Sequence, residues 1–178
     1  MNLLNAFYAL LIGYLFGCFQ TSYFISKIII NKDIRNLGSG NAGASNITSE
    51  MGWKYGILTA ILDILKAYAS VYIVSVVFIN SFNQLDLMVI AGSSSVIGHI
   101  FPFFMNFKGG KGIACYIGML LALDFNFGIL SILAIILITI VTDYVSIGSI
   151  LLYITIPLLI YFSDNYSIII ILCSIVLS

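Results

Sequence analysis

The chain has 178 residues, of which 61% are hydrophobic and only 8% are charged, and its formal net charge at pH 7 is zero. Its mean hydropathy is +1.14. Soluble globular domains carry about 25% charged residues, because a water-exposed surface needs charge or polarity. The composition therefore excludes a soluble domain and predicts an all-α polytopic integral membrane protein.

Seven apolar segments follow one another along the chain. They cover about residues 3–30, 55–79, 87–104, 113–123, 127–141, 146–162 and 166–177. A helix rises about 1.5 Å per residue and the hydrocarbon core is roughly 30 Å thick, so the fourth and seventh segments are short for a full crossing. We expect the fourth to be a half-helix buried by its neighbours. We also expect residues 1–178 to form a single transmembrane domain with about seven helices.

Basic residues gather in two of the predicted loops. The loop after the first segment is flanked by Lys27, Lys32, Arg35 and Lys54, and the loop after the third by Lys108 and Lys111. The turns after the second, fourth and sixth segments carry Asp86, Asp124 and Asp164 instead. Cytoplasmic loops have an excess of Lys and Arg, so seven spans with an outside N-terminus would place all six basic residues inside. The polar chemistry is then expected at the cytoplasmic face, provided that the fourth segment counts as a crossing.

The first of these loops contains the sequence GSGNAGASN at residues 38–46. Glycines permit positive φ and close backbone approach, and consecutive N–H groups in such a loop can form an anion-binding concavity. A helix that began near its end would add a positive N-terminal potential for phosphate. The candidate phosphate-binding residues are Ser39, Gly40, Asn41, Gly43 and Asn46. An ordinary turn rich in Gly, Ser and Asn explains the composition equally well.

The second loop carries the sequence FKGGKG at residues 107–112. Two lysines that bracket two glycines would offer a compact phosphate both backbone donors and ammonium charge. Lys111, with a glycine on either side, is the candidate catalytic residue, whereas Lys108 would also suit anchoring to anionic lipid headgroups. The candidate binding residues of this loop are Lys108, Gly109, Gly110 and Gly112.

Further polar residues lie in or beside apolar segments. His99, the chain's single histidine, is a candidate catalytic residue, although a lone histidine is more often a structural hydrogen-bonding group. Asp63 and Lys66 share a helical face, and a lone charge at mid-bilayer costs roughly 2.5–3.5 kcal/mol, so we expect a structural ion pair. Ser146, in a polar cluster that begins at Asp143, is either a catalytic residue or the N-cap of the sixth helix.

Metal and cofactor chemistry is not expected. Cys18, Cys115 and Cys173 each stand alone in an apolar run, without the spacing of metal ligands. One histidine and no ligand-spaced cysteines leave too few donors for a catalytic zinc site. No motif for binding nucleic acid is present either.

The motifs, taken in chain order, resemble those of one family. DIR at 33–35 precedes GSGN at 38–41, GH at 98–99 and FP at 101–102 precede FKGGKG at 107–112, and YVS follows at 144–146. Asp63 and Lys66 also fit the family's second helix. These features resemble the bacterial acyl-phosphate:glycerol-3-phosphate acyltransferases (PlsY), and the resemblance covers almost the whole chain.

The resemblance implies an enzyme of the bacterial cytoplasmic membrane whose site faces the cytoplasm. The family transfers an acyl chain from acyl phosphate to the 1-hydroxyl of glycerol 3-phosphate, which gives lysophosphatidic acid and phosphate for phospholipid synthesis. The implied partners are these two substrates and the lipid bilayer. Lys111 would stabilise charge that develops in the transition state. Ser39 and Ser146 would position phosphate or hydroxyl groups.

The chain departs from the family pattern at several positions. Ser49 stands where the family usually has a phosphate-binding arginine, and Asp143 stands in the region where the family usually has an arginine shortly before the serine of the third motif. Residues 17–20 read GCFQ instead of GSxP. The chain also stops at Ser178, before the family's polar tail with its His and Asn. Serine cannot replace the bidentate contacts of arginine. The alternative is therefore a non-catalytic relative that binds phosphate-bearing lipid or a membrane partner. A small transporter is less favoured, because seven spans do not divide into inverted halves.

Overall fold

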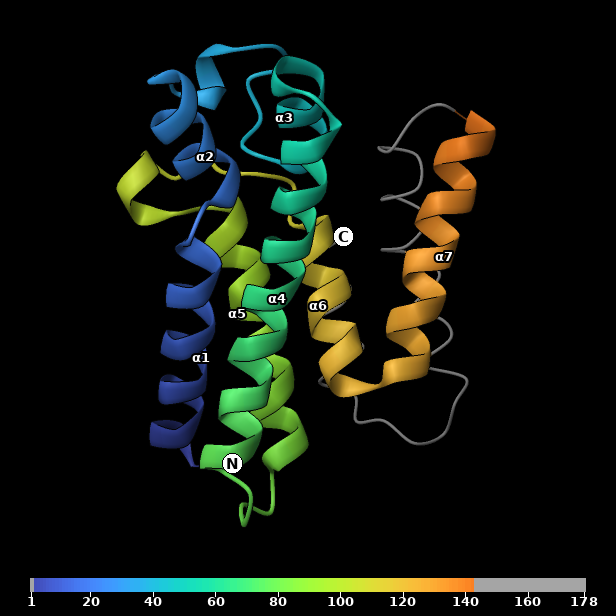
Figure 1. The fold of residues 1–178 in the computed structure, drawn as a ribbon. Coiled ribbons are helices and arrows are strands. Elements are labelled where there is room, and N and C mark those ends of the chain that lie inside the picture. Colours follow the sequence, from blue (N-terminus) through green and yellow to red (C-terminus); the bar gives the residue numbers. More distant parts are fainter. Residues whose placement is uncertain (1, 143–178) are drawn as a thin grey trace.

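The computed structural model describes residues 2–142, and this part of the chain is all-α, without a strand. Figure 1 shows its helices. In chain order these are α1 (Leu3–Cys18), α2 (Thr21–Ile30), the 3₁₀ helix η1 (Ile34–Asn36), α3 (Ala44–Met51), α4 (Trp53–Val77), α5 (Gln84–Ile100), the 3₁₀ helix η2 (Phe103–Met105), α6 (Ile113–Leu123) and α7 (Phe125–Thr142).

Four helical stretches in this range are long and apolar enough to cross a membrane. They are Leu3–Ile30, Trp53–Val77, Gln84–Met105 and Phe125–Thr142, with mean hydropathies between 1.5 and 2.4. They correspond to the first, second, third and fifth predicted segments, so the predicted class of helical membrane protein is confirmed. The predicted segments 146–162 and 166–177 lie outside the described residues, and the count of seven spans stays a prediction.

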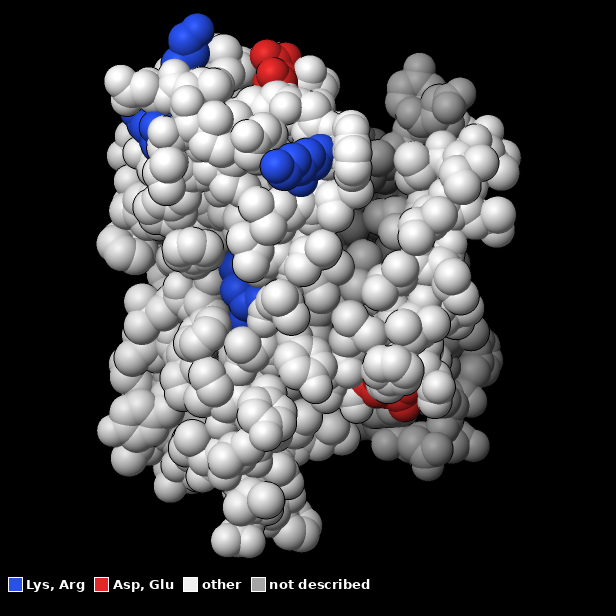
Figure 2. All heavy atoms as spheres, in the orientation of Figure 1, with Lys and Arg blue, Asp and Glu red and all other residues white. Residues whose placement is uncertain are grey.

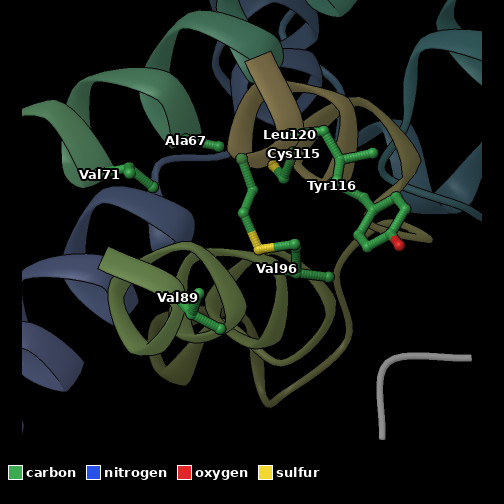
Figure 3. Close-up of a cluster of buried hydrophobic side chains, with 8 residues drawn as sticks. Ala67, Val71, Val89, Val96, Cys115, Tyr116 and Leu120 are labelled. Carbon is green, nitrogen blue, oxygen red and sulfur yellow. The ribbon is translucent and has the colours of Figure 1, made fainter. Parts of the chain in front are cut away.

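The fourth predicted segment is the short helix α6, which has 11 residues. Its length of about 16 Å is half the thickness of a hydrocarbon core. Every residue from Cys115 to Leu120 is buried, which confirms the predicted half-helix covered by its neighbours. Its side chains pack against α4 and α5 in the cluster of Figure 3, which contains Ala67, Val71, Val89, Val96, Cys115, Tyr116 and Leu120. Figure 1 shows that α6 and α7 run antiparallel and join at the end of the bundle away from α3.

Helices α1 and α5 pack in very close contact through small residues. A Cβ atom added to Gly13 would overlap the backbone carbonyl of Ala91, and one added to Gly17 would overlap that of Ser95. Small residues four positions apart let two membrane helices approach until their backbones touch. The contact therefore depends on the absence of side chains at Gly13 and Gly17.

The first membrane segment is interrupted between α1 and α2, which the hydropathy pattern does not show. Phe19 and Gln20 have extended backbone conformations. Irregular backbone at membrane depth is tolerated only where protein groups satisfy it. Here the Phe19 carbonyl accepts a hydrogen bond from the Lys66 ammonium. The buried Gln20 side chain donates from Nε2 to the His99 carbonyl at 2.8 Å. Hydrogen bonds from α4 and to α5 thus stabilise the break.

The connection from α2 to α4 is more ordered than a simple loop. It contains η1 and the eight-residue helix α3, both inside the loop predicted between the first and second membrane segments. Arg35 ties this connection to the loop after α5, because its Nη1 donates to the Met105 carbonyl at 2.7 Å. Asp33 holds the same guanidinium in an ion pair of 2.7 Å. The hydrogen bond from Arg35 is the main cause that lowers the pKa of Asp33 below its usual value.

Candidate functional site

A cavity of about 430 Å³ lies where the two glycine-rich loops meet α4, α6 and α7. Seven of the sequence-predicted residues line it: Ser39, Asn41, Gly43, Asn46, His99, Lys111 and Gly112. The rest of the wall is mostly apolar and includes Ala60, Ile64, Ile113, Ala114, Ile117, Ile132 and Ile135. The fold therefore brings together two motifs that are about 70 residues apart, beside a wall that suits a hydrocarbon group.

Four predicted residues do not line this cavity, and one lies outside the described range. Gly40, Lys108, Gly109 and Gly110 are absent from the lining. Lys108 is exposed, as its alternative role of anchoring to lipid headgroups requires. Ser146 lies outside the described residues, and so does Asp143.

Asn46 organises the first glycine-rich loop from within. Its side chain is 97% buried, and Nδ2 lies 3.0–3.1 Å from the carbonyl oxygens of Ile34, Leu37 and Asn41. Its Oδ1 accepts a hydrogen bond from the N–H of Ser39 at 2.9 Å. The amide is thus committed to the loop itself, so Asn46 shapes the cavity wall.

The predicted concavity of consecutive backbone donors is not what this loop forms. The N–H of Ser39 bonds Asn46, that of Gly40 bonds the Leu37 carbonyl at 3.0 Å, and that of Ala42 bonds the Gly109 carbonyl at 3.4 Å. These donors point into the protein. Backbone donors come instead from α3, which begins at Ala44, and Gly43, Ala44 and Ser45 line the cavity.

The first turn of α3 gives the cavity a positive end. The first N–H groups of a helix have no acceptor within the helix, and the helix dipole adds roughly half a positive charge there. An anion at such a position receives both hydrogen bonds and favourable potential. The helix that starts near the end of the loop is the separate short helix α3 and not the second membrane helix, and its preference for phosphate stays a prediction.

Gly109 and Gly110 allow the second loop to fold against the end of α5. Their N–H groups donate to the carbonyls of Ile100 and His99, at 2.9 and 3.0 Å. A Cβ on Gly109 would overlap the His99 carbonyl, and one on Gly110 would overlap the His99 ring. Their amides are therefore used inside the protein, and the prediction that they bind phosphate directly is not supported. The two glycines place the neighbouring Lys111 at the cavity.

Lys111 and Gly112 form the turn into α6. Gly112 has φ of +80°, a left-handed conformation that favours glycine, and it is the N-cap of α6. Lys111 is exposed and lines the cavity. Of the described residues in the lining, Lys111 is the one lysine or arginine. The cavity therefore combines one ammonium group with the N-terminus of α3.

A buried polar network lies directly behind the cavity. Lys66 Nζ is 2.9 Å from Asp63 Oδ1 and 2.9 Å from His99 Nδ1. Thr21 donates to Asp63 Oδ1 at 2.9 Å, and both Asp63 and His99 line the cavity. The predicted ion pair between Asp63 and Lys66 is confirmed. Its contact with His99 joins it to the site, which the helical spacing alone does not show.

Ser49 lies on α3 beyond the cavity. Its hydroxyl donates to the Asn46 carbonyl at 2.9 Å, and the side chain is exposed. Ser49 follows Ser45 by one helical turn, so the two share a face of α3. A longer cationic side chain at this position would extend toward the cavity, and serine supplies none.

Within residues 2–142, no three His, Cys, Asp or Glu side chains gather in a group that could hold a metal ion. The polar groups of the described lining are therefore hydroxyl, amide, carboxylate, imidazole and ammonium groups.

Helices of membrane-spanning length, with a mostly apolar cavity beside two polar loops, define an integral membrane protein with a candidate ligand site. The chain matches the family model described as glycerol-3-phosphate acyltransferase over residues 7–178. It therefore belongs to the glycerol-3-phosphate acyltransferase family, and the resemblance predicted from the motifs is confirmed.

Relatives from several bacteria support this membership. The chain is 37% identical over 158 residues to glycerol-3-phosphate acyltransferase 1 of Oceanobacillus iheyensis, covering 86% of this chain and 76% of the relative. It is 40% identical over 159 residues to the glycerol-3-phosphate acyltransferase of Chlorobium phaeobacteroides, covering 85% of this chain and 67% of the relative.

The fold is also similar to solved structures of PlsY (YgiH), an integral membrane glycerol 3-phosphate acyltransferase. The glycerol 3-phosphate form matches with a TM-score of 0.85 and 33% identity, over 97% of this chain and 84% of that chain. The lysophosphatidic acid form matches with a TM-score of 0.81 and 32% identity, over 97% of this chain and 83% of that chain.

Proposed function

We propose that this chain transfers an acyl group from acyl phosphate to the 1-hydroxyl of glycerol 3-phosphate, giving lysophosphatidic acid and phosphate. Membership of the acyltransferase family supports the reaction type. The glycerol 3-phosphate and lysophosphatidic acid forms of PlsY support the acceptor and the product. One observation carries the proposal: a single cavity joins Lys111 and the N-terminus of α3 to an apolar wall of α4, α6 and α7.

The two ends of the cavity suit the two parts of the substrates. Both substrates carry phosphate, and the polar end offers an ammonium and the first-turn donors of α3. An acyl chain needs an apolar surface, which the isoleucine-rich wall provides. The reacting carbonyl would then lie at the junction of the two ends, near Lys111.

The chemistry requires charge stabilisation and a route for one proton. The acceptor hydroxyl oxygen forms a bond to the acyl carbon while the bond from that carbon to the phosphate oxygen breaks. The electron pair leaves with phosphate, and the hydroxyl proton is transferred to the departing phosphate. Lys111 would stabilise the negative charge on the acyl oxygen and leaving group. Ser39 and Asn41 would orient the phosphate and hydroxyl groups, and Ser146 stays a predicted contributor.

The basic residues support a site at the cytoplasmic face of a bacterial cytoplasmic membrane. Figure 2 shows basic side chains mostly over the end of the molecule that holds α2 and α3. The two loops that frame the cavity contain Lys32, Arg35, Lys108 and Lys111, and cytoplasmic loops carry such an excess. On this proposal residues 1–178 act as one transmembrane acyltransferase domain.

The proposal is tested with the purified full-length chain reconstituted into lipid and supplied with both substrates. Release of phosphate and formation of lysophosphatidic acid are the expected results. Lys111→Ala should lower turnover by about 100-fold or more, because it removes a group that stabilises transition-state charge. Lys108→Ala is the matched control, since this exposed lysine of the same loop does not line the cavity, and turnover should stay close to wild type.

A folded wild-type protein without turnover would overturn the proposal. Equal turnover of wild type and Lys111→Ala would contradict the role of Lys111. Circular dichroism and thermal unfolding of each variant show whether the helices remain folded.

A further inference from the structure

Lys66 can only donate hydrogen bonds, and this determines how its buried partners carry their protons. An ammonium group has three N–H donors and no acceptor. Its oxygen and nitrogen partners are Asp63 Oδ1 at 2.9 Å, His99 Nδ1 at 2.9 Å and the Phe19 carbonyl oxygen, and the Cys115 sulfur, a weak acceptor, also lies within reach. The side chain is only 6% exposed, so water has little access as a substitute partner. Because the ammonium has no acceptor, His99 Nδ1 takes the acceptor role in its 2.9 Å contact with Lys66.

This requirement determines the tautomer of His99. A ring nitrogen that accepts a hydrogen bond carries no proton, so the proton of the neutral imidazole lies on Nε2. Nε2 is on the far side of the ring from Lys66, against Gly110, where an added Cβ would overlap it. Gly110 directly precedes Lys111, and His99 itself lines the cavity. The ring thus has an N–H donor on the side that faces the loop of Gly110 and Lys111.

Without Lys66, the surroundings would favour the opposite tautomer. Asp63 Oδ1 is 3.8 Å from His99 Nδ1, so its carboxylate would become the nearest charged partner of that nitrogen. A carboxylate accepts hydrogen bonds only, so it would draw a proton onto Nδ1. The ring would then present an acceptor at Nε2, or become a cation. The contact with Lys66 therefore decides which nitrogen of His99 carries the proton.

The backbone of His99 is held as firmly as its ring. The His99 carbonyl accepts from Gln20 Nε2 at 2.8 Å and from the N–H of Gly110 at 3.0 Å. Side-chain rotation is therefore the main freedom left to the residue, and the contact with Lys66 restrains it.

We propose that Lys66 is a positioning residue, which holds His99 as the Nε2–H tautomer so that the ring donates a hydrogen bond to a substrate oxygen in the cavity. This role rests on the proposed acyltransferase function. Asp63 and Thr21 stabilise this arrangement of Lys66 and His99. Asp63 neutralises the buried ammonium, and Thr21 donates a hydrogen bond of 2.9 Å to the Asp63 carboxylate.

The chain offers an unusually direct test, because His99 is its single histidine. The full-length protein is labelled with ¹⁵N-histidine, purified through a tag without histidine and reconstituted in lipid at neutral pH. Its nitrogen NMR spectrum then reports on this ring alone. We expect an unprotonated Nδ1 signal and a protonated Nε2 signal. In Lys66→Met, Nδ1 should become protonated. Lys54→Met, at an exposed position of the same helix α4, should keep the wild-type spectrum.

Kinetics then test whether the tautomer matters for acyl transfer. Lys66→Met should lower kcat about tenfold or more, with a smaller change in the KM for glycerol 3-phosphate, because a donor to the transition state is lost. His99→Gln, whose amide nitrogen can take the position of Nε2, should retain more activity than His99→Asn. Lys54→Met should show wild-type kcat.

Each outcome has a definite meaning. A protonated Nδ1 in the wild-type spectrum overturns the proposal, and this result does not depend on any variant's folding. The predicted wild-type spectrum with wild-type kcat in Lys66→Met overturns the positioning role. The predicted spectrum in a wild type without turnover supports the tautomer assignment and counts against the proposed acyltransferase function instead.

Discussion

At the scale of single residues, the most consequential feature is the charge of the cavity. Lys111 is the one lysine or arginine that the described lining contains, while the proposed reaction brings two phosphate-bearing substrates together. The N-terminus of α3 contributes roughly half a charge at most. The position of Ser49, one turn beyond Ser45 on the cavity side of α3, is where a second cation would fit.

Ser49→Arg is therefore expected to strengthen phosphate binding. A hydrogen bond to a charged group contributes about 1.5–3 kcal/mol, which corresponds to about tenfold or more in affinity. The measurement is the inhibition constant of inorganic phosphate in the acyl-transfer assay, which should fall about tenfold. Ser49→Gln, of similar length but neutral, is the control. Equal inhibition constants for the two variants would show that position 49 does not reach the bound phosphate.

The residue types of the site could be predicted from the sequence, but the partners of several could not. Lys111, Ser39 and His99 were identified from motif and composition, and all three line the cavity. Asn46 and Gly110 were expected to contact ligand, whereas their polar groups bond within the protein. Their partners are only 5–12 residues away in the chain, but which acceptor each polar group meets depends on how the loop folds, and residue types alone do not show that.

At the scale of helices, hydropathy predicted the lengths well and the interruptions poorly. The fourth predicted segment has the same bounds as α6, Ile113–Leu123. The break at Gln20 was missed because its cause is the hydrogen bond to His99, 79 residues away. Helix α3 is short and mostly polar, so the hydropathy pattern gives no sign of it beside the long apolar helix α4.

The packing of α1 on α5 gives a prediction about stability. Gly13→Val would place side-chain atoms where the Ala91 carbonyl now lies, so the two helices must separate. Overpacking of this kind costs about 1–3 kcal/mol. We expect a lower thermal unfolding temperature in lipid or mild detergent. Leu10→Val, on the exposed side of α1, also introduces a β-branched residue and should unfold near the wild-type temperature. The packing argument fails if both variants unfold alike.

At the scale of the whole molecule, the cavity, the two glycine-rich loops and most basic residues lie toward one end. The opposite end has the turn between α4 and α5 and the junction of α6 with α7, which contains Asp124. Because α6 and α7 run antiparallel, the short α6 reverses the chain direction as a crossing does. This supports the orientation predicted from the positive-inside pattern. Asp63 and Lys66 lie in the buried network beside the cavity, as the proposed positioning role of Lys66 requires.

That orientation can be measured by labelling cysteines placed at the two ends. Phe82, 101% exposed in the turn between α4 and α5, and Lys32, exposed in the loop after α2, are suitable positions. A membrane-impermeant maleimide should label Phe82→Cys in intact cells, and should label Lys32→Cys only after permeabilisation, because the basic loop faces the cytoplasm. The parent protein gives the background, to which the buried Cys18 and Cys115 should add little. The reverse labelling pattern would place the cavity on the outer side, away from substrates made in the cytoplasm, and would contradict the proposed location of the reaction.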